Sequence, residues 1–216
     1  MVYFAQYAYN QYAVKQIEGL KSERRQLKLQ FEALKSQLSP HYLFNSLNTI
    51  SSLVYKDASQ TEKFIRGLAQ TYEYILSTNN SKFVLLSEEI EFVRSYNYLL
   101  QVRFANNVSL EIDVPDEIMS SKIPPLTLQM LVENAVKHNV INDKQTIHIS
   151  VKGHNLDLQV VNTKTISVGR KNSFEIGLSN IRKRYSLLSD KKIIIDDGEK
   201  YKVTLPVIAS LNLQSV

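Results

Sequence analysis

Apolar residues recur at alternating spacings of three and four between Ile17 and Leu38, and this repeat constrains the fold more than any other feature. The repeat persists over three heptads, which is typical of a helical coiled coil. Arg24 occupies one seam position, where a charge can set register or oligomeric state. We expect a helix that pairs with a second copy of the chain; a single amphipathic helix in a monomer is the alternative. The seams hold Ile17, Arg24, Phe31 and Leu38, and Leu20, Leu27 and Leu34.

The helical pattern resumes after Pro40 and continues to Ile50. A proline inside a helix removes one backbone hydrogen bond and bends the rod. A turn at Asp57–Gln60 separates this helix from a second amphipathic helix at Thr61–Ser77. The two helices predict an antiparallel hairpin, and two hairpins would form a four-helix bundle in a dimer. Residues 1–79 are therefore expected to form an all-α domain of coiled coil and dimerisation helices.

The composition excludes several classes of protein. The 216 residues are 44% hydrophobic and 22% charged, as in ordinary globular domains. The chain has no cysteine, which excludes disulfides and thiolate chemistry and favours a reducing compartment. The net charge of +5 comes from residues spread along the chain. They do not form the basic stripe that nucleic-acid binding requires. No apolar run reaches the roughly 18 residues that span a bilayer, although residues 2–14 suit the end of a membrane helix lying outside this chain.

A second domain is expected at residues 80–216, after the polar stretch Thr78–Ser81. Ser87 is expected to cap a helix that reaches Phe104, and Gly153–Asn155 to form a hairpin turn. Helical and strand patterns together predict a two-layer α+β domain with helices on a mostly antiparallel sheet. The expected strands are Val108–Val114, Thr146–Val151, Leu156–Val161, Lys192–Asp196 and Tyr201–Leu205, and the other helices are Leu126–Asn139, after two prolines, and Gly177–Leu188.

His41 is the first candidate for chemistry. It follows Pro40, and Asn45 lies four residues on, on the same helix face. Neutral imidazole is nucleophilic near neutral pH, and one ring nitrogen can attack while the other is held. A single histidine in a helix is more often a partly buried polar residue, so this segment alone does not show that His41 takes part in chemistry.

A second group of candidates lies on the helix expected at Leu126–Asn139. Asn134, Lys137 and His138 share one side of it, with Glu133 beside them. An amide oxygen is a suitable ligand for Mg²⁺, which takes few protein ligands, and lysine supplies a compact charge to phosphate. A solvated helix face would carry similar residues. Farther on, a polar loop ends in a helix at Gly177, where free backbone amides would make a phosphate site.

In this order, the three motifs resemble the LytS/YehU-type sensor histidine kinases, whose catalytic domain belongs to the GHKL ATPase superfamily. The resemblance extends from Leu34 to Leu205. The segment Leu38–Asn45 resembles the phosphoacceptor signature of the family. Ile123–His138 resembles its nucleotide-binding box, and Ile176–Tyr185 resembles its later box.

The resemblance implies a role for each candidate residue, with ATP and Mg²⁺ as the nucleotide and metal. His41 would be the phosphoacceptor, and Asn134 would hold Mg²⁺ between the ATP phosphates. Lys137 and His138 would contact phosphate. Residues 1–79 would then hold the histidine-phosphotransfer helices and residues 80–216 the catalytic ATP-binding domain. The far side of the pocket would be lined by Gly177, Leu178 and Asn180.

The chain departs from the family pattern at two positions. Asn162 stands where the family usually has an aspartate that reads the adenine amino group, and a neutral acceptor makes a weaker bond. Glu175 stands where a glycine usually lies, and its charge would repel phosphates if it pointed inward. The general base is also not obvious: Tyr42 follows His41 where many histidine kinases have an acid, and Glu133 is the nearest candidate.

The sequence thus predicts an ATP-dependent protein histidine kinase that acts as a homodimer. It would autophosphorylate on His41 and pass the phosphoryl group to an aspartate of a response regulator, with no role for nucleic acid. We expect the cytoplasmic part of an inner-membrane protein whose sensor region lies outside this chain. One alternative is a dimeric signalling scaffold that binds nucleotide poorly, and another is a serine kinase or ATPase of the same superfamily.

Overall fold

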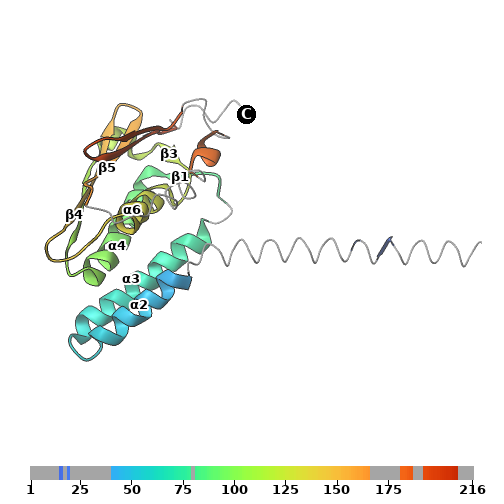
Figure 1. Cartoon of the computed structure of the whole chain (residues 1–216). Coiled ribbons are helices and arrows are strands. Elements are labelled where there is room, and N and C mark those ends of the chain that lie inside the picture. The colour runs from blue at the N-terminus through green and yellow to red at the C-terminus, as the bar shows by residue number, and fades with distance from the viewer. Residues whose placement is uncertain are drawn as a thin grey trace, which may run out of the picture. The chain divides into compact units, whose positions relative to one another are not determined.

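Figure 1 shows a computed structural model of the chain, which describes residues 15, 16, 19, 40–78, 81–165, 181–186 and 192–208. The chain divides into two compact units, Met1–Asn45 and Ser46–Val216. Apart from Gly19, the heptad repeat lies outside the described residues. The boundary between residues 79 and 80 stays a prediction. Within the described ranges, no helix is both long and apolar enough to cross a membrane.

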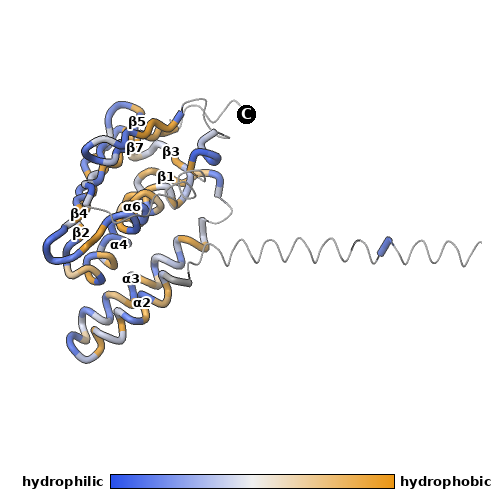
Figure 2. Tube along the Cα trace, viewed as in Figure 1, coloured by the Kyte–Doolittle hydropathy of each residue, from blue (hydrophilic) through white to orange (hydrophobic). Residues whose placement is uncertain are grey.

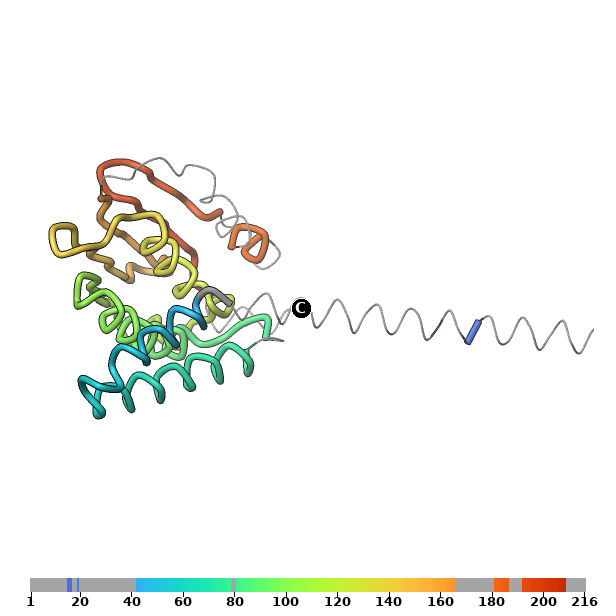
Figure 3. The backbone as a smooth tube through the Cα atoms, turned by 60° about the horizontal axis from the view of Figure 1, so that its bottom comes forward, coloured from blue at the N-terminus to red at the C-terminus, as the bar shows by residue number. Residues whose placement is uncertain are grey.

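Two helices begin the described part of the fold. α2 spans Pro40–Leu53 and crosses the division between the units, and α3 spans Ala58–Ser77. From Ser46 on, α2 runs antiparallel to α3, as two views of the backbone show (Figures 1 and 3). Asp57 is the N-cap of α3, because its side chain accepts a hydrogen bond from the Gln60 N–H at 2.8 Å. The turn between the two helices precedes Asp57 rather than following it. That the two helices form a dimerisation hairpin stays a prediction.

α3 packs closely against α4, Leu86–Arg103. A Cβ atom at Gly67 on α3 would lie 3.2 Å from Cδ2 of Leu99 on α4, so the glycine allows the helices to approach. The predicted Ser87 cap is wrong by two residues, because Leu85 is the N-cap of α4. The buried Leu86 donates its N–H to the carbonyl of Ser121 at 2.8 Å and draws the helix start toward it.

Five strands form a sheet in the order β2-β4-β5-β7-β6. β2 is parallel to β4 and the other pairs are antiparallel, so the mostly antiparallel sheet is confirmed. A separate two-stranded sheet pairs β1 with β3, and neither strand was predicted. The strands are β1 (Val84–Leu85), β2 (Val108–Asp113), β3 (Lys122–Ile123), β4 (Ile147–His154), β5 (Asp157–Asn162), β6 (Ile194–Asp197) and β7 (Tyr201–Pro206).

α4 and α6 (Thr127–Lys137) cover one face of the large sheet, which confirms the two-layer α+β architecture (Figure 1). Alternate strand residues on that face, such as Ile149, Val160 and Val203, are buried in the core. The opposite face is polar and carries a shallow hollow lined in part by His148 and Lys152. Figure 2 shows hydrophobic stretches along the helices and strands and hydrophilic residues in the loops.

The turn between β4 and β5 lies at residues 155 and 156, so the predicted turn at Gly153–Asn155 is misplaced. Gly153 instead pairs with Leu158 inside the ladder. A Cβ atom at Gly153 would lie 2.6 Å from Ile118 Cδ1 and 2.8 Å from Pro115 Cδ. Position 153 therefore requires glycine because the segment around the short helix α5 (Asp116–Met119) lies close to β4. A turn is not the reason.

Candidate functional site

α6 begins without a capping side chain of its own. Its N-cap, Leu126, has a left-handed backbone with φ of 62° and makes no side-chain bond. The carboxylate of Glu89 on α4 accepts hydrogen bonds from the Leu126 N–H at 3.0 Å and the Leu128 N–H at 3.1 Å. A negative group at this end also complements the helix dipole. α6 therefore starts on a carboxylate that another helix supplies.

Glu89 is fully buried, with 0% of its surface exposed. It accepts a further hydrogen bond from the Tyr74 hydroxyl on α3 at 2.9 Å. Burial raises the pKa of Glu89 to about 7, although hydrogen bonds from Tyr74 and the first turn of α6 lower it. The sequence analysis missed this residue. Its spacing from Leu86 and Val93 puts an acid on the apolar face of α4, and that is the signal that could have revealed it.

We expect the stability contributed by Glu89 to fall as the pH rises. Its folded pKa of about 7 lies above the 4.5 of a free carboxyl, so the contribution is complete below pH 4.5 and lost as the pH passes about 7. The difference corresponds to about 3 kcal/mol as an order of magnitude. Urea unfolding of the wild type and Glu89→Gln near pH 5 and pH 8 measures it. A difference between the two proteins that does not change with pH would contradict the assignment.

The last turns of α6 carry four of the predicted site residues. Glu133 and Asn134 are half-buried, and Lys137 is exposed. His138 is the C-cap, and its N–H donates to the Asn134 carbonyl at 3.1 Å. Burial, followed by the charge of Lys137, lowers the pKa of His138, so its ring is neutral at pH 7. This end of α6 thus offers one amide, one ammonium group and one neutral imidazole.

Asn162 is the last residue of β5 and only 6% of its surface is exposed. Its side-chain Nδ2 donates to the Thr163 carbonyl at 2.8 Å. This bond fixes the amide plane and directs Oδ1 away from Thr163 as an acceptor. An acceptor held in this way suits the amino group of a base.

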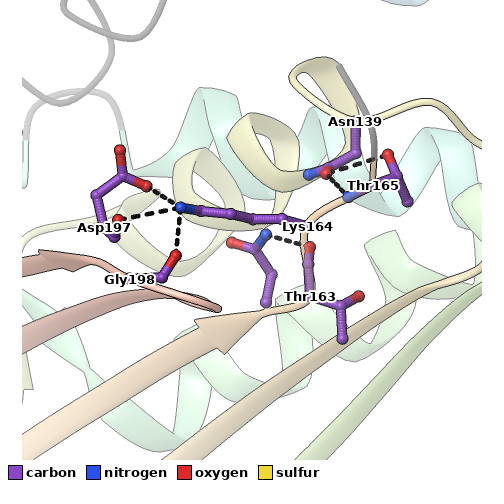
Figure 4. A network of polar contacts seen from close by, with 7 residues as sticks. Asn139, Thr163, Lys164, Thr165, Asp197 and Gly198 are labelled. Atoms are coloured by element: carbon purple, nitrogen blue, oxygen red, sulfur yellow. Dashed lines mark hydrogen bonds and ion pairs between the residues drawn. The ribbon is translucent and has the colours of Figure 1, made fainter.

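A polar network joins the end of α6 to the segment that follows β5 (Figure 4). The Asn139 Nδ2 donates to the Ala135 carbonyl at 2.7 Å, and its Oδ1 accepts from the Thr165 N–H at 2.7 Å. The Thr165 hydroxyl in turn accepts from the Val140 N–H at 2.7 Å. Asn139 therefore holds the C-terminal end of α6 beside the end of β5, and sequence reasoning had placed it only as the end of a helix.

Lys164 lies between these contacts and points the other way (Figure 4). Its ammonium donates to the backbone carbonyls of Asp197 at 3.2 Å and Gly198 at 2.7 Å, and it forms an ion pair with the Asp197 carboxylate. Its charge thus binds the turn between β6 and β7.

The helix at residues 181–186 approaches the start of α6. The Arg184 guanidinium donates to the Pro125 carbonyl at 2.9 Å. Tyr185 is buried, and its pKa is raised first by burial and then by the charge of Glu89. The expected pocket residues Gly177, Leu178 and Asn180, and the departure at Glu175, lie outside the described residues.

The first unit carries the predicted phosphoacceptor. The backbone of His41 lies in the first turn of α2, and its side chain is outside the described part of the structure. Asn45 lies one turn on and is half-buried. The structure thus brings Asn134, Lys137, His138 and Asn162 to one end of the α+β layer. Together these residues offer hydrogen-bond donors, an acceptor and a positive charge.

Comparison with known proteins also points to histidine kinases. Residues 29–108 match the family model described as histidine kinase. Sensor histidine kinase BtsS of Escherichia coli K12 is 31% identical over 159 residues, covering 72% of this chain and 28% of that protein. Sensor protein LytS of Enterococcus faecalis is 33% identical over 135 residues, covering 61% of this chain and 23% of that protein. The chain thus spans less than a third of the length of these relatives.

Among solved structures, Acinetobacter baumannii histidine kinase AdeS has a TM-score of 0.43 at 12% identity, covering 83% of this chain and 95% of that one. The assignment does not depend on this distant likeness. It rests on the family match and on the two sensor kinases. The chain belongs to the histidine kinase family.

Proposed function

We propose that this chain is the kinase core of a two-component sensor histidine kinase with a GHKL-type ATPase domain. It transfers the γ-phosphate of ATP to His41, and an aspartate of a response regulator then takes the phosphoryl group. The observation that supports the proposal is the hydrogen bond between Asn139, which follows α6, and Thr165, which follows β5. It joins the end of the helix to which we assign phosphate binding to the segment after Asn162, to which we assign the base.

The nucleotide would lie along this end of the domain. Asn162 Oδ1 accepts a hydrogen bond from the adenine amino group, because Nδ2 is already bonded to Thr163. Lys137 supplies charge to the phosphates, and the neutral His138 supplies a hydrogen-bonding nitrogen. The remaining wall is assigned to Gly177, Leu178 and Asn180.

Asn134 is the residue that fits Mg²⁺. Its amide is a hard oxygen ligand, and Mg²⁺ commonly takes one or two protein ligands and the rest from phosphates and water. Its half-buried position on α6, one turn before Lys137 and His138, suits such a shared site. When bound, Mg²⁺ neutralises charge that develops on the transferring phosphoryl group. Asn134 orients the phosphates by holding that ion.

His41 is the nucleophile of the proposed reaction. A neutral ring nitrogen forms the P–N bond to the γ-phosphorus, while the bond to the ADP oxygen breaks and its electron pair leaves with ADP. The other ring nitrogen loses its proton, to Glu133 or to water. Asn45 lies one turn from His41 on α2 and is assigned to hydrogen-bond a water or the phosphoryl group attached to His41.

The chemistry of the label tests the proposal. The wild-type chain incubated with Mg²⁺ and γ-labelled ATP should take up phosphate that is lost in acid and kept in base, as a phosphoramidate is. Acid-stable, base-labile label would indicate serine or threonine and contradict the proposal. If calorimetry detects no heat at millimolar ATP on the folded chain, the nucleotide-poor scaffold is favoured instead.

We also propose that the chain works as a homodimer through α2. Three large apolar residues are exposed on this helix: Leu43 by 42%, Phe44 by 68% and Leu47 by 48%. A run of exposed apolar residues on one helix favours a covered interface. The chain would be the cytoplasmic part of an inner-membrane protein whose spanning segments lie elsewhere.

Phe44→Glu should weaken the dimer by at least about 100-fold, because each subunit would bring a charge into the apolar interface. Sedimentation equilibrium measures the dissociation constant. Ile194→Glu is the matched control, since Ile194 on β6 is also exposed, by 64%, and receives the same substitution. Equal dissociation constants for the two variants, or a monomeric wild type, would contradict the interface.

A further inference from the structure

Glu89 lies where three separate segments meet. Its Oε2 accepts hydrogen bonds both from the Tyr74 hydroxyl on α3 and from the Leu126 N–H at the start of α6. Its Oε1 accepts from the Leu128 N–H, two residues farther on. Tyr185, from the helix at residues 181–186, is close enough for the Glu89 charge to raise its pKa. One carboxylate thus touches a hairpin helix and the nucleotide-binding helix at once.

This arrangement exceeds what a helix cap requires. A serine or aspartate at position 126 would cap α6 locally and leave its polar atoms in water. The fold instead buries a carboxylate completely, and a buried charge costs stability even when it is hydrogen-bonded. A costly buried group of this kind is better explained by geometric specificity than by stability.

On the α3 side, the link is packed against α4. The Tyr74 ring stacks on Phe92 of α4, with 4.2 Å between ring centroids and 18° between planes. Because Tyr74 and Leu126 share one oxygen atom, a displacement of the last turns of α3 alters the bond that holds the first turn of α6. α6 is a single helix of 11 residues, so a shift of its first turn reaches Asn134 and Lys137.

We propose that Glu89 is a positioning residue that couples the hairpin helix α3 to the nucleotide-binding helix α6. Tyr74 is the part of this coupling that belongs to α3. The inference rests on the proposed kinase function, because α6 is the helix assigned to hold ATP. Glu89 touches neither nucleotide nor His41 in this proposal. It acts by fixing where α6 stands relative to α3.

The test uses the full chain with two substitutions. Tyr74→Phe removes only the hydroxyl and should leave the Mg-ATP dissociation constant within about 2-fold while slowing autophosphorylation at saturating ATP by about 5- to 10-fold. Glu89→Gln places an NH₂ group against backbone N–H donors and should also weaken Mg-ATP binding by about 10-fold. A loss of affinity and rate in equal measure by Tyr74→Phe would mark a merely structural role and overturn the proposal.

Matched controls and a local readout complete the test. Tyr55→Phe and Glu91→Gln make the same changes at exposed side chains and should behave as the wild type. Amide hydrogen exchange at residues 126–129 should rise in Tyr74→Phe, although residue 74 lies on another helix. When Tyr74→Phe and Glu89→Gln are combined, exchange should equal that of Glu89→Gln alone, because both substitutions break the same link between α3 and α6.

The two proposals fail in different ways. A wild-type chain that neither binds Mg-ATP nor takes up phosphate refutes the kinase function. Hydrogen exchange then still decides the coupling, because it needs no nucleotide. If exchange at residues 126–129 is the same in Tyr74→Phe as in Tyr55→Phe, α3 is not coupled to α6 and the inference is wrong.

Discussion

His41→Gln should abolish acid-labile phosphorylation, reducing label from γ-labelled ATP by at least about 100-fold, to background. Glutamine approximates the size and polarity of histidine, but its amide nitrogen is not nucleophilic. The Mg-ATP dissociation constant should stay within about 2-fold of the wild type, because the nucleotide-binding residues assigned to α6 and β5 are unchanged. Acid and base stability of the label, measured beside calorimetry on the same preparations, separates loss of the acceptor from loss of binding.

The chain offers a matched control for this experiment. It has four histidines, and His154 is exposed at the end of β4. His154→Gln should leave phosphorylation unchanged, since this side chain has no part in the proposed reaction. Label that survives in His41→Gln would sink the assignment of the acceptor. If that label were lost only in His154→Gln, the acceptor would be His154.

The sequence predicted the α+β layer well because its strands follow simple alternation. Residues such as Ile149 and Val160 face the helices while their neighbours face the open side, and this period of two is visible in the sequence. The position of the β4–β5 turn could not be predicted in the same way. Gly153 resembles a turn residue locally, but the reason for it is the contact with Pro115 and Ile118.

The candidate site likewise contains residues that the sequence could predict and residues that it could not. Asn134, Lys137 and His138 could be predicted as candidates because they lie within about one helical turn of each other, which a spacing argument can detect. Asn139 and Thr165 were missed because their contact joins segments 26 residues apart. Glu89 and Leu126 are 37 residues apart, so only the fold reveals that a buried acid starts α6.

Asn134→Ala should reduce the rate of autophosphorylation by at least about 100-fold, because alignment and charge neutralisation supply most of the barrier reduction in phosphoryl transfer. The fold should survive, since alanine favours a helix more than asparagine does and Asn134 is only half-buried. Circular dichroism checks the helix content. The rate is measured with labelled ATP over a range of Mg²⁺ concentrations, where the variant should need far more Mg²⁺ than the wild type.

A conservative variant separates the metal-holding role from simple packing. Asn134→Asp keeps an oxygen ligand at the same position and adds a charge that attracts the cation but repels phosphate. It should therefore retain more activity than Asn134→Ala and reach its half-maximal rate at a lower Mg²⁺ concentration. Asn107→Ala, at a surface asparagine that contacts Asp143, should match the wild type. Equal losses in Asn134→Ala and Asn134→Asp, with no change in Mg²⁺ dependence, would show that Asn134 does not hold the ion. The metal would then have to be held by other groups, and α6 would contribute only Lys137 and His138 to the phosphates.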